Sequence, residues 1–512
     1  MMKQILFLIL VLFLFSNSVN AGEKSSITGI SLSGTTVANT GGIDAIGLNP
    51  ARLVRFDRPR EIDEIEYTIS HDSINSARKR IQIEHDTTIF VPEKLPNFTM
   101  TLIPAFSFNL GTDFINYDIY SKYFTGTGAT GINGKKIGKK LTNNDKEEIL
   151  KLFPSGLAET HIDFETRLFG LTIHNNFLGS FGFTLTERFN LNFNMPKAYL
   201  QLPLYGLDSN GITYDLNGTT IKAQEIREMA FSYAREINGI PYIKDFAAGF
   251  SVKILQGLFH FDLDKYDVQF GNKTTIDGNG QPGIDLFGKA NIHYYASMAS
   301  VFDSGKKFTP FPQDAGKGLA FDFGTSFNAY DDITVAFSIT DIGSMKWNRN
   351  VIEGNLRSHF RINNITSQDQ LDSIDAFTKS LQDSISNLRG DTISSFNSEL
   401  PTSLQFGAAF RYNVPYFGNV LFAMQYKQGF NNALGNSKRA KISFATEYRP
   451  LNFIPLRMGI SFGGKDRFNI SGGLGFDFYH FEWDIGSENI GFLFIPKAFH
   501  QFSFGTGMRL RF

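Results

Sequence analysis

Apolar and polar side chains alternate with a period of two along much of this chain, and the last eleven residues form one such run. One face of that run carries Phe502, Phe504, Thr506, Met508, Leu510 and Phe512. The other face carries Ser503, Gly505, Gly507, Arg509 and Arg511. Because successive strand side chains point to opposite faces, we expect this strand to meet an apolar phase on one side and a polar space on the other.

The same alternation recurs from one end of the chain to the other. It is found at residues 98–102, 181–185, 250–254, 321–327, 333–339, 404–412, 458–462 and 470–478. Turn residues such as Tyr330-Asp331-Asp332 separate the runs, and the period-two pattern gives about 14 to 16 strands. Such runs suit tilted strands of about 9 to 11 residues that cross a membrane. The alternative is a large soluble β-sandwich or solenoid, which would need to hide many more apolar faces than two sheets offer.

Two segments have helical spacing instead. Residues Asn143 to Phe153 predict a short helix capped by Asn144. A longer helix is predicted from about Ser367 to Leu388, because apolar residues recur there at helical spacing. Those residues are Leu371, Ile374, Phe377, Leu381 and Ile385. Since both ends of a barrel chain are normally periplasmic, strand parity places this insertion, at about 342–401, on the extracellular side.

The N-terminus predicts export from the cytoplasm. Residues 1–21 have a charged Lys3, an unbroken apolar stretch from Ile5 to Phe15 and a small-residue cleavage site at Val19-Asn20-Ala21, which is the pattern of a signal peptide. No later stretch approaches the roughly 18 apolar residues that a spanning helix needs. A mature chain embedded in a membrane would therefore have to be a β-barrel, the other fold that satisfies every backbone polar group in lipid.

Composition agrees with a barrel and excludes several functions. The chain has 53 Phe, 18 Tyr and 48 Gly but only 2 Trp, and its mean hydropathy is -0.14. Barrels are rich in aromatic residues and in tight turns, and their polar inner faces dilute the apolar outer faces. A net charge of -1 argues against a nucleic-acid partner. The absence of cysteine excludes disulfides, thiolate metal sites and a cysteine nucleophile.

Motifs for chemistry are weak. The run Gly126-Thr127-Gly128-Ala129-Thr130-Gly131 matches a nucleotide-binding pattern but lacks the strand and helix that this pattern requires, so we interpret it as a glycine loop. Asp262, Asp264 and Asp267 lack the spacing of a calcium loop. The nine histidines, among them His161, His174 and His293, form no metal motif or Ser–His pair. We therefore predict no catalytic residue, no metal and no cofactor, and no enzyme activity.

The segment after the signal peptide carries a resemblance to a known family. Its small, glycine-rich run from Gly34 through Gly41-Gly42 to Asn49-Pro50-Ala51 resembles the N-terminal hatch of the FadL-like long-chain fatty-acid transporter superfamily, which also includes shuttle barrels of the type IX secretion system. The later chain looks like a Bacteroidetes-type branch of these barrels. Arg52 departs from the pattern, because a glycine usually follows Asn-Pro-Ala there. The alternative is that this segment is a flexible periplasmic leader.

The resemblance implies an all-β fold: an antiparallel transmembrane barrel of about 14 strands, with 16 as the alternative, and a hatch in its lumen. The predicted parts are a signal peptide at 1–21, a hatch at 22–60 and a barrel at 61–512 with a helical insertion. Gly41, Gly42, Asn49 and Pro50 are the predicted hatch hinge. A terminal aromatic, here Phe512, resembles the signal by which the barrel assembly machinery recognises outer-membrane barrels.

Two functions follow from this architecture. The first is passive transport of hydrophobic or amphipathic small molecules across a bacterial outer membrane, with outer-membrane lipid and a hydrophobic ligand as partners. The second is a structural or docking barrel that binds a protein partner through the extracellular insertion. The two hypotheses differ in one structural feature: whether the lumen behind the hatch is apolar and open to lipid, or filled with polar side chains.

Overall fold

The computed structural model describes most of the chain apart from the N-terminus and several connections. The described residues are 26–55, 59–62, 89–92, 96–112, 117–123, 140–153, 156–206, 211–241, 243–276, 280, 282–300, 311–330, 332–365, 390–414, 417–464, 467–478, 480–491 and 501–512. The predicted signal peptide, the glycine loop at 126–131 and the helix predicted at 367–388 lie outside the described residues.

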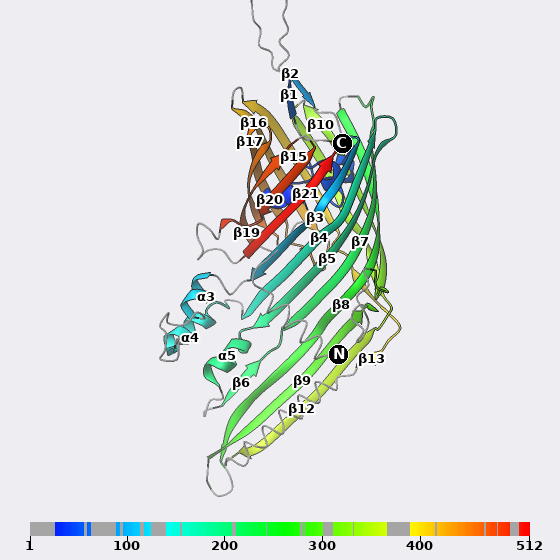
Figure 1. Cartoon of the computed structure of the whole chain (residues 1–512). Helices are drawn as coiled ribbons and strands as arrows, with labels where there is room; N and C mark the ends of the chain where they lie inside the picture. Colours follow the sequence, from blue (N-terminus) through cyan, green and yellow to red (C-terminus); the bar gives the residue numbers. More distant parts are fainter. Residues whose placement is uncertain are drawn as a thin grey trace, which may run out of the picture.

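Fourteen antiparallel strands close into a barrel, which confirms the predicted fold. Figure 1 shows the barrel from the side. Each strand pairs with the next one around the wall, and the last strand pairs with the first. In order, the wall strands are β3 (Phe98–Thr112), β4 (Leu157–Asn175), β5 (Gly179–Pro196), β7 (Thr220–Glu236), β8 (Lys244–Ile276), β10 (Gly316–Tyr330), β11 (Ile333–Trp347), β15 (Ser403–Val414), β16 (Gly418–Gly429), β17 (Lys441–Leu451), β18 (Ile454–Gly463), β19 (Arg467–Asp477), β20 (Phe481–Ser487) and β21 (Gln501–Arg511).

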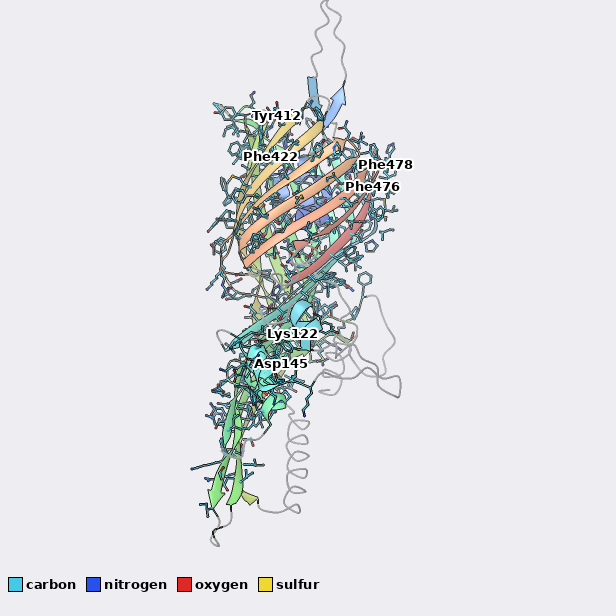
Figure 2. The ribbon with its side chains drawn as sticks, turned by 90° about the vertical axis from the view of Figure 1, so that its left-hand side faces the viewer. Lys122, Asp145, Tyr412, Phe422, Phe476 and Phe478 are labelled. Carbon is cyan, nitrogen blue, oxygen red and sulfur yellow. The ribbon has the colours of Figure 1, made fainter. Side chains whose placement is uncertain are left out.

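The wall strands alternate between exposed apolar and buried polar or small side chains. In β18, for example, Leu456, Met458 and Phe462 are exposed, whereas Arg457 and Ser461 between them are buried. The exposed rings also pair across strands, which stabilises the sheet. Figure 2 shows other aromatic side chains around the barrel, among them Tyr412, Phe422, Phe476 and Phe478. A continuous exposed apolar surface of this kind is typical of a barrel that faces lipid.

The two ends of the barrel differ in the length of their connections. Short turns join β4 to β5, β7 to β8, β10 to β11, β15 to β16, β17 to β18 and β19 to β20 at the end where the chain terminates. Long connections lie at the other end, including those between β3 and β4 and between β11 and β15. Short periplasmic turns and long extracellular loops are the usual arrangement in outer-membrane barrels. The described strands of the insertion at 342–401 lie at the end with the long connections.

Strand β8 extends far beyond the wall and forms a projecting sheet, here called the arm (Figure 1). Its first half pairs with β10 in the wall, and its second half pairs with β9 (Pro282–Met298) outside it. The arm also contains β12 (Ile352–Ile365), β6 (Ile212–Asp215) and the short β13 (Asp391–Thr392). The described part of the predicted insertion at 342–401 contains β12, β13 and β14 (Phe396–Glu399), which pairs with the end of β11, and the helix predicted there lies outside the described residues. A separate two-stranded sheet contains β1 (Pro59–Ile62) and β2 (Ile89–Pro92).

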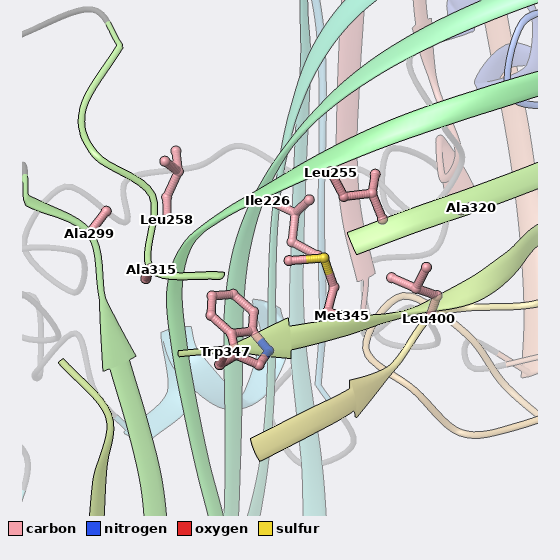
Figure 3. Close-up of a cluster of buried hydrophobic side chains, with 9 residues drawn as sticks. All are labelled: Ile226, Leu255, Leu258, Ala299, Ala315, Ala320, Met345, Trp347 and Leu400. Carbon is pink, nitrogen blue, oxygen red and sulfur yellow. The ribbon is translucent and has the colours of Figure 1, made fainter. Parts of the chain in front are cut away.

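A cluster of buried apolar side chains lies where the arm leaves the barrel (Figure 3). Trp347 is fully buried at its centre, and its indole N–H donates to Ser398 Oγ at 2.9 Å. Gly257 and Gly316 make room for this ring, because a Cβ at either position would come within 3.0 Å of it. The cluster therefore fixes the point at which β8 changes partners from β10 to β9.

Three short helices lie in the described connections: α3 (Tyr117–Tyr123), α4 (Asn143–Leu150) and α5 (Ala198–Tyr205). The predicted helix at 143–153 is confirmed, but its cap is Thr142 and not Asn144. The Thr142 hydroxyl accepts the Asp145 N–H at 3.2 Å while the Asp145 carboxylate accepts the Thr142 N–H at 2.9 Å, a capping box. Within the described residues, none of the helices has the length and apolarity needed to span a membrane.

Candidate functional site

The described part of the hatch, residues 26–55, folds inside the barrel. It contains α2 (Ile27–Ser31), which Ser26 caps, and two turns of 3₁₀ helix, η1 (Gly42–Ala45) and η2 (Pro50–Val54). Nearly all of its side chains are buried, and its elements contact β4, β5, β7, β8, β10 and β18 to β21. Small residues allow this compact path, since they let the backbone approach the wall closely.

Asn49 and Pro50 lie directly against the wall. Asn49 is fully buried; its Nδ2 donates to Val37 O at 2.9 Å, and its Oδ1 accepts the Ala51 N–H at 3.1 Å. Two wall glycines create this seat. A Cβ on Gly324 would lie 1.9 Å from Asn49 Oδ1, and one on Gly249 would lie 2.6 Å from the backbone of Pro50. Any larger residue at these wall positions would displace the Asn49-Pro50 turn.

Wall side chains also bind the hatch backbone. Gln425 Oε1 accepts the N–H groups of Thr36 and Val37 at 2.7 and 2.8 Å. On the wall strands β11 and β19, Ser338 Oγ donates to Leu48 O at 2.8 Å, and Ser471 Oγ donates to Ser31 O at 2.9 Å. These bonds come from three different strands, so the wall holds the hatch at several points.

One carboxylate of the hatch, Asp44, bonds to two wall arginines. Its Oδ1 accepts from Arg167 Nη1 at 2.9 Å, and its Oδ2 accepts from Arg509. Burial alone would raise the pKa of Asp44, but the two guanidinium groups outweigh it and lower the pKa to about 2. A lowered pKa stabilises the folded state above the ordinary carboxyl pKa, and this contribution is lost only as the pH falls toward 2. The bond therefore persists in mild acid.

Asp44 is part of a larger set of ion pairs on the inner wall, here called the arginine network. Its members are Asp44, Arg167, Glu447, Arg449, Arg457, Asp477, Glu482, Asp484, Arg509 and Arg511. Five positive and five negative groups balance. Arg457, for instance, bonds to Glu447 at 2.6 Å and to Asp484 at 2.5 Å. Buried charges need such pairing, because an unpaired buried charge destabilises the folded state by on the order of several kcal/mol.

A second set of buried charges, here called the lysine cluster, comprises Arg188, Glu228, Lys253, Asp322 and Asp341. Lys253 is fully buried, and its Nζ lies 2.7 Å from Asp322 Oδ2 and 2.6 Å from Asp341 Oδ1. Asp341 has a φ of 58°, which is uncommon outside glycine, and its N–H donates to Asp322 Oδ1 at 2.7 Å. The described lumen is thus polar and charged and is not an apolar channel.

A small cavity lies between the hatch and the wall, here called the hatch–wall cavity. It is lined by Ile27, Ile43, Asp44, Thr101, Ala105, Arg167, Asp484, Gly507, Met508 and Arg509, and its volume is about 20 Å³. That is room for roughly one water. A larger cavity of about 80 Å³ lies between hatch residues 39–44 and the arginine network. Apolar groups and guanidinium groups meet in the smaller one.

The wall is irregular beside the hatch–wall cavity. The pairing of β3 with β4 passes from Met100↔Leu171 directly to Ala105↔Arg167, and the pairing of β3 with β21 also shifts near Met508. Pro104 explains the interruption, because proline has no N–H to donate and occurs in strands mainly at bulges and edges. The wall therefore has fewer regular hydrogen bonds here than elsewhere.

The predicted hinge and assembly residues occupy different surroundings. Gly41 and Gly42 line the larger cavity, and Gly42 has a φ of 58° with open space where a Cβ would lie. Asn49 and Pro50, in contrast, are held against the wall. Phe512 exchanges two backbone hydrogen bonds with Phe98, at 2.8 and 3.0 Å, and its ring is exposed. The hinge role and the assembly role stay predictions.

Sequence reasoning did not identify the wall glycines, Pro104 or the two charge sets. One signal was available: charged residues stand between apolar ones inside strands, as Arg457 stands between Leu456 and Met458. Of the three aspartates that were considered as calcium ligands, Asp264 is hydrogen-bonded to a histidine, with its Oδ1 at 2.6 Å from His293 Nδ1. No group of three or more His, Asp or Glu side chains in the described part of the chain could hold a metal ion.

Known structures include barrels similar to this chain. The Ralstonia pickettii toluene transporter TbuX is 10% identical, with 95% of this chain and 97% of that chain covered and a TM-score of 0.40. The Pseudomonas putida toluene transporter TodX is 10% identical, with 96% and 97% covered and a TM-score of 0.38. A Pseudomonas aeruginosa FadL homologue is 9% identical, with 96% and 98% covered and a TM-score of 0.32.

No curated protein matches the chain in sequence. A family model described as "Family of unknown function (DUF5723)" matches residues 91–488, which is most of the barrel.

Proposed function

This chain belongs to the Family of unknown function (DUF5723), and we propose that it is an outer-membrane barrel for the passive transport of small amphipathic molecules. The observation that carries the proposal is the hatch–wall cavity, which lies beside the irregular wall at Pro104. The exposed apolar surface of the wall supports a place in a membrane. No energy source is needed for such transport, because the ligand would move down its own gradient.

The polar lumen limits which molecules could pass. A purely apolar molecule on the barrel axis would meet the arginine network and the lysine cluster, and burying their charges against it would be costly. An amphipathic acid fits better. Its apolar part would contact Ile27, Ile43 and Ala105, and its carboxylate would take the place of Asp44 on Arg167 and Arg509.

The cavity is too small for such a ligand in this conformation, so binding has to move the hatch or the wall. Ligand exchange at Asp44 provides a route. Once Arg167 and Arg509 bind the ligand carboxylate, the ionic bonds between Asp44 and the wall are lost, and η1 becomes free to shift. The apolar part of the ligand would enter or leave through the wall at Leu102 and Ile103, which are 46% and 50% exposed.

A substitution that fills the cavity tests this proposal. In Ala105→Trp, a substitution at a buried residue that lines the cavity, overpacking costs about 1–3 kcal/mol, which corresponds to about five- to 150-fold weaker ligand binding. The measurement is influx of a dansyl-labelled undecanoic acid into liposomes that contain the purified protein. Met458→Trp is the matched control, because Met458 is 56% exposed on the outer face of β18. Equal influx through both variants would refute a transport route through the cavity.

Replacing Asp44 tests the role of the carboxylate. Asp44→Asn removes the internal competitor, so the anionic probe should bind more tightly than to the unmodified protein. A neutral probe of the same length, the corresponding dansyl amide, should show no change. Weaker binding of the acid, or equal gains for both probes, would contradict the proposed carboxylate site.

A polar lumen is the feature expected of the second candidate, a docking barrel that binds a protein partner. Deleting residues 22–53 separates the two functions. The deletion should leave a folded barrel, because the wall strands supply their own hydrogen bonds. For a transporter it should open an ion leak in planar bilayers and abolish selective uptake of the acid. Unchanged conductance and unchanged uptake would favour the docking barrel.

A further inference from the structure

The arm has an open edge along β12. On one side, β12 pairs with β9 along its whole length, from Ile352↔Ala296 to Ile365↔Ile284. On the other side, it pairs only with β13, at Ile352↔Thr392 and Glu353↔Asp391. Within the described residues, the backbone from Gly354 to Ile365 therefore has no strand on that side. A row of free N–H and C=O groups of this length is a template for another strand.

Side chains along this edge form two different rows. Cross-strand partners share a face, so His359 lies beside Lys289 of β9, and Arg357 follows on the same face. All three are exposed. Arg361, 63% exposed, continues the row and contacts Asp285 at 2.9 Å. The edge thus presents basic groups on one face of the sheet.

The opposite face of the same edge carries Gly354, Leu356 and Ser358, of which Leu356 is the apolar side chain. Leu356 pairs with Ile292, and both are half-buried. Strand residues alternate between faces, so a strand added to β12 would place every second side chain beside the basic row and the others beside Leu356 and Ile292. Alternating acidic and apolar residues satisfy both rows at once.

We propose that the open edge of β12 binds an extended segment of another protein, whose acidic and apolar residues alternate, by adding a strand to the arm. Backbone hydrogen bonds supply the attachment, and the two side-chain rows select the sequence. The inference does not depend on transport. The arm lies at the end of the barrel with the long connections, so on an outer-membrane barrel this partner meets the chain outside the cell.

A second copy of the chain is a poorer partner for this edge. Two copies of β12 in antiparallel pairing would set one basic row against the other, and like charges directly opposite each other are destabilising. An acidic strand avoids this repulsion. The selectivity should also weaken as salt rises, since exposed charges are screened.

The test uses the full-length protein in detergent micelles and two labelled peptides, one of four Glu-Val repeats and one of four Lys-Val repeats. Fluorescence anisotropy measures binding, and hydrogen exchange measures protection of residues 354–361. We expect the Glu-Val peptide to bind and to slow exchange along β12. The Lys-Val peptide should do neither. Binding of both peptides alike, or binding without slower exchange in β12, would overturn the proposal.

A charge reversal at the edge provides the decisive variant. The double substitution Arg357→Glu with His359→Glu should weaken binding of the Glu-Val peptide by about tenfold or more and should allow the Lys-Val peptide to bind. Gain of the second peptide shows that the variant is folded. Lys265→Glu is the matched control, since Lys265 is exposed on β8 and not on the edge. If the control changes binding as much as the double variant, the edge is not the site.

One further result would overturn the proposal without any peptide. If residues 354–361 already exchange as slowly as β9 in the free protein, the edge is covered. Analytical ultracentrifugation would then tell whether a second copy covers it or the chain's own residues do.

Discussion

Strand β8 has two halves with opposite surroundings, although one pattern runs through both. In the wall half, apolar side chains such as Phe250 and Ile254 are 46% and 44% exposed, and Lys253 is fully buried. In the arm half, Phe259 and Leu263 are buried, at 7% and 5% exposure, while Lys265 is exposed. The apolar residues of the first half face outward from the barrel, and those of the second face protein.

Alternation of apolar and polar residues therefore identifies a strand, but it does not show which face of the strand meets lipid, water or protein. In the wall, the outward face is apolar and the enclosed face holds charges in ion pairs. In the arm, the apolar face packs against α5 and β6, where Tyr214 and Phe270 lie 5.4 Å apart, and the charged face meets water. Substitution of the same residue type should therefore change the free energy of unfolding by different amounts in the two halves.

The largest difference is expected for lysine. Lys253→Met leaves Asp322 and Asp341 without their shared cation, and breaking a buried ion pair in this way costs about 3–5 kcal/mol. Lys265→Met in the arm removes an exposed pair, worth about 0–1 kcal/mol. Urea unfolding in lipid vesicles, followed by tryptophan fluorescence, measures both. Similar midpoints for the two variants would show that the lysine cluster is not important for stability.

Phenylalanine should separate the halves by location. Phe250→Arg places a charge on the lipid face of the wall, which costs about 2–4 kcal/mol near the bilayer midplane, and it should reduce the assembled, heat-modifiable barrel. Phe270→Arg disturbs the packing of α5 and β6 and should leave the barrel assembled. Limited proteolysis should then cut the arm alone. Loss of heat-modifiability in Phe270→Arg would mean that arm and wall fold as one unit.

The smallest effect concerns pH and is confined to the arm. The His293 ring is hydrogen-bonded to two carboxylates, with Nε2 at 2.9 Å from Glu353 Oε1 and Nδ1 at 2.6 Å from Asp264 Oδ1. These bonds, the one to Glu353 above all, raise the pKa of His293. A raised pKa stabilises the folded arm below about pH 6.5, and the contribution disappears as the pH rises through the higher folded value. Hydrogen exchange of β9 should accelerate from acidic to alkaline pH beyond its intrinsic change. His293→Gln should remove this extra acceleration, while Lys289→Gln should not.

The barrel itself could be predicted from sequence because its information is local. Each wall strand carries its own alternation, as residues 404–412 do, and a reader needs no other strand to recognise it. The hatch was predicted from one motif around Asn49-Pro50. The arm was not predicted, since β9 and β12 carry a weaker pattern among charged residues, and we interpreted the second as part of a loop and helix insertion.

The candidate site could not be predicted because its contacts join distant parts of the chain. Asp44 and Arg509 are 465 residues apart, and Lys253 and Asp341 are 88 apart. Sequence shows that each is charged and not which partner it meets. The same holds for the wall glycines. The sequence does not show that Gly324 must be small, because the reason is its contact with Asn49 in the folded barrel.

The hydrogen bonds between Phe98 and Phe512 have a consequence for the order in which the wall strands pair during folding. These residues begin and end the wall, more than 400 positions apart, yet they exchange two hydrogen bonds. Every other neighbouring pair in the wall lies nearer in sequence, the widest being β8 and β10, where Lys244 and its partner Asn328 are 84 positions apart, and could form while the chain is still being delivered. Closure alone must wait for the final residue, and the ends of a chain this long meet slowly. Until then the wall is an open sheet with a gap between its first and last strands. The lumen is accessible through this gap, and the hatch can enter there.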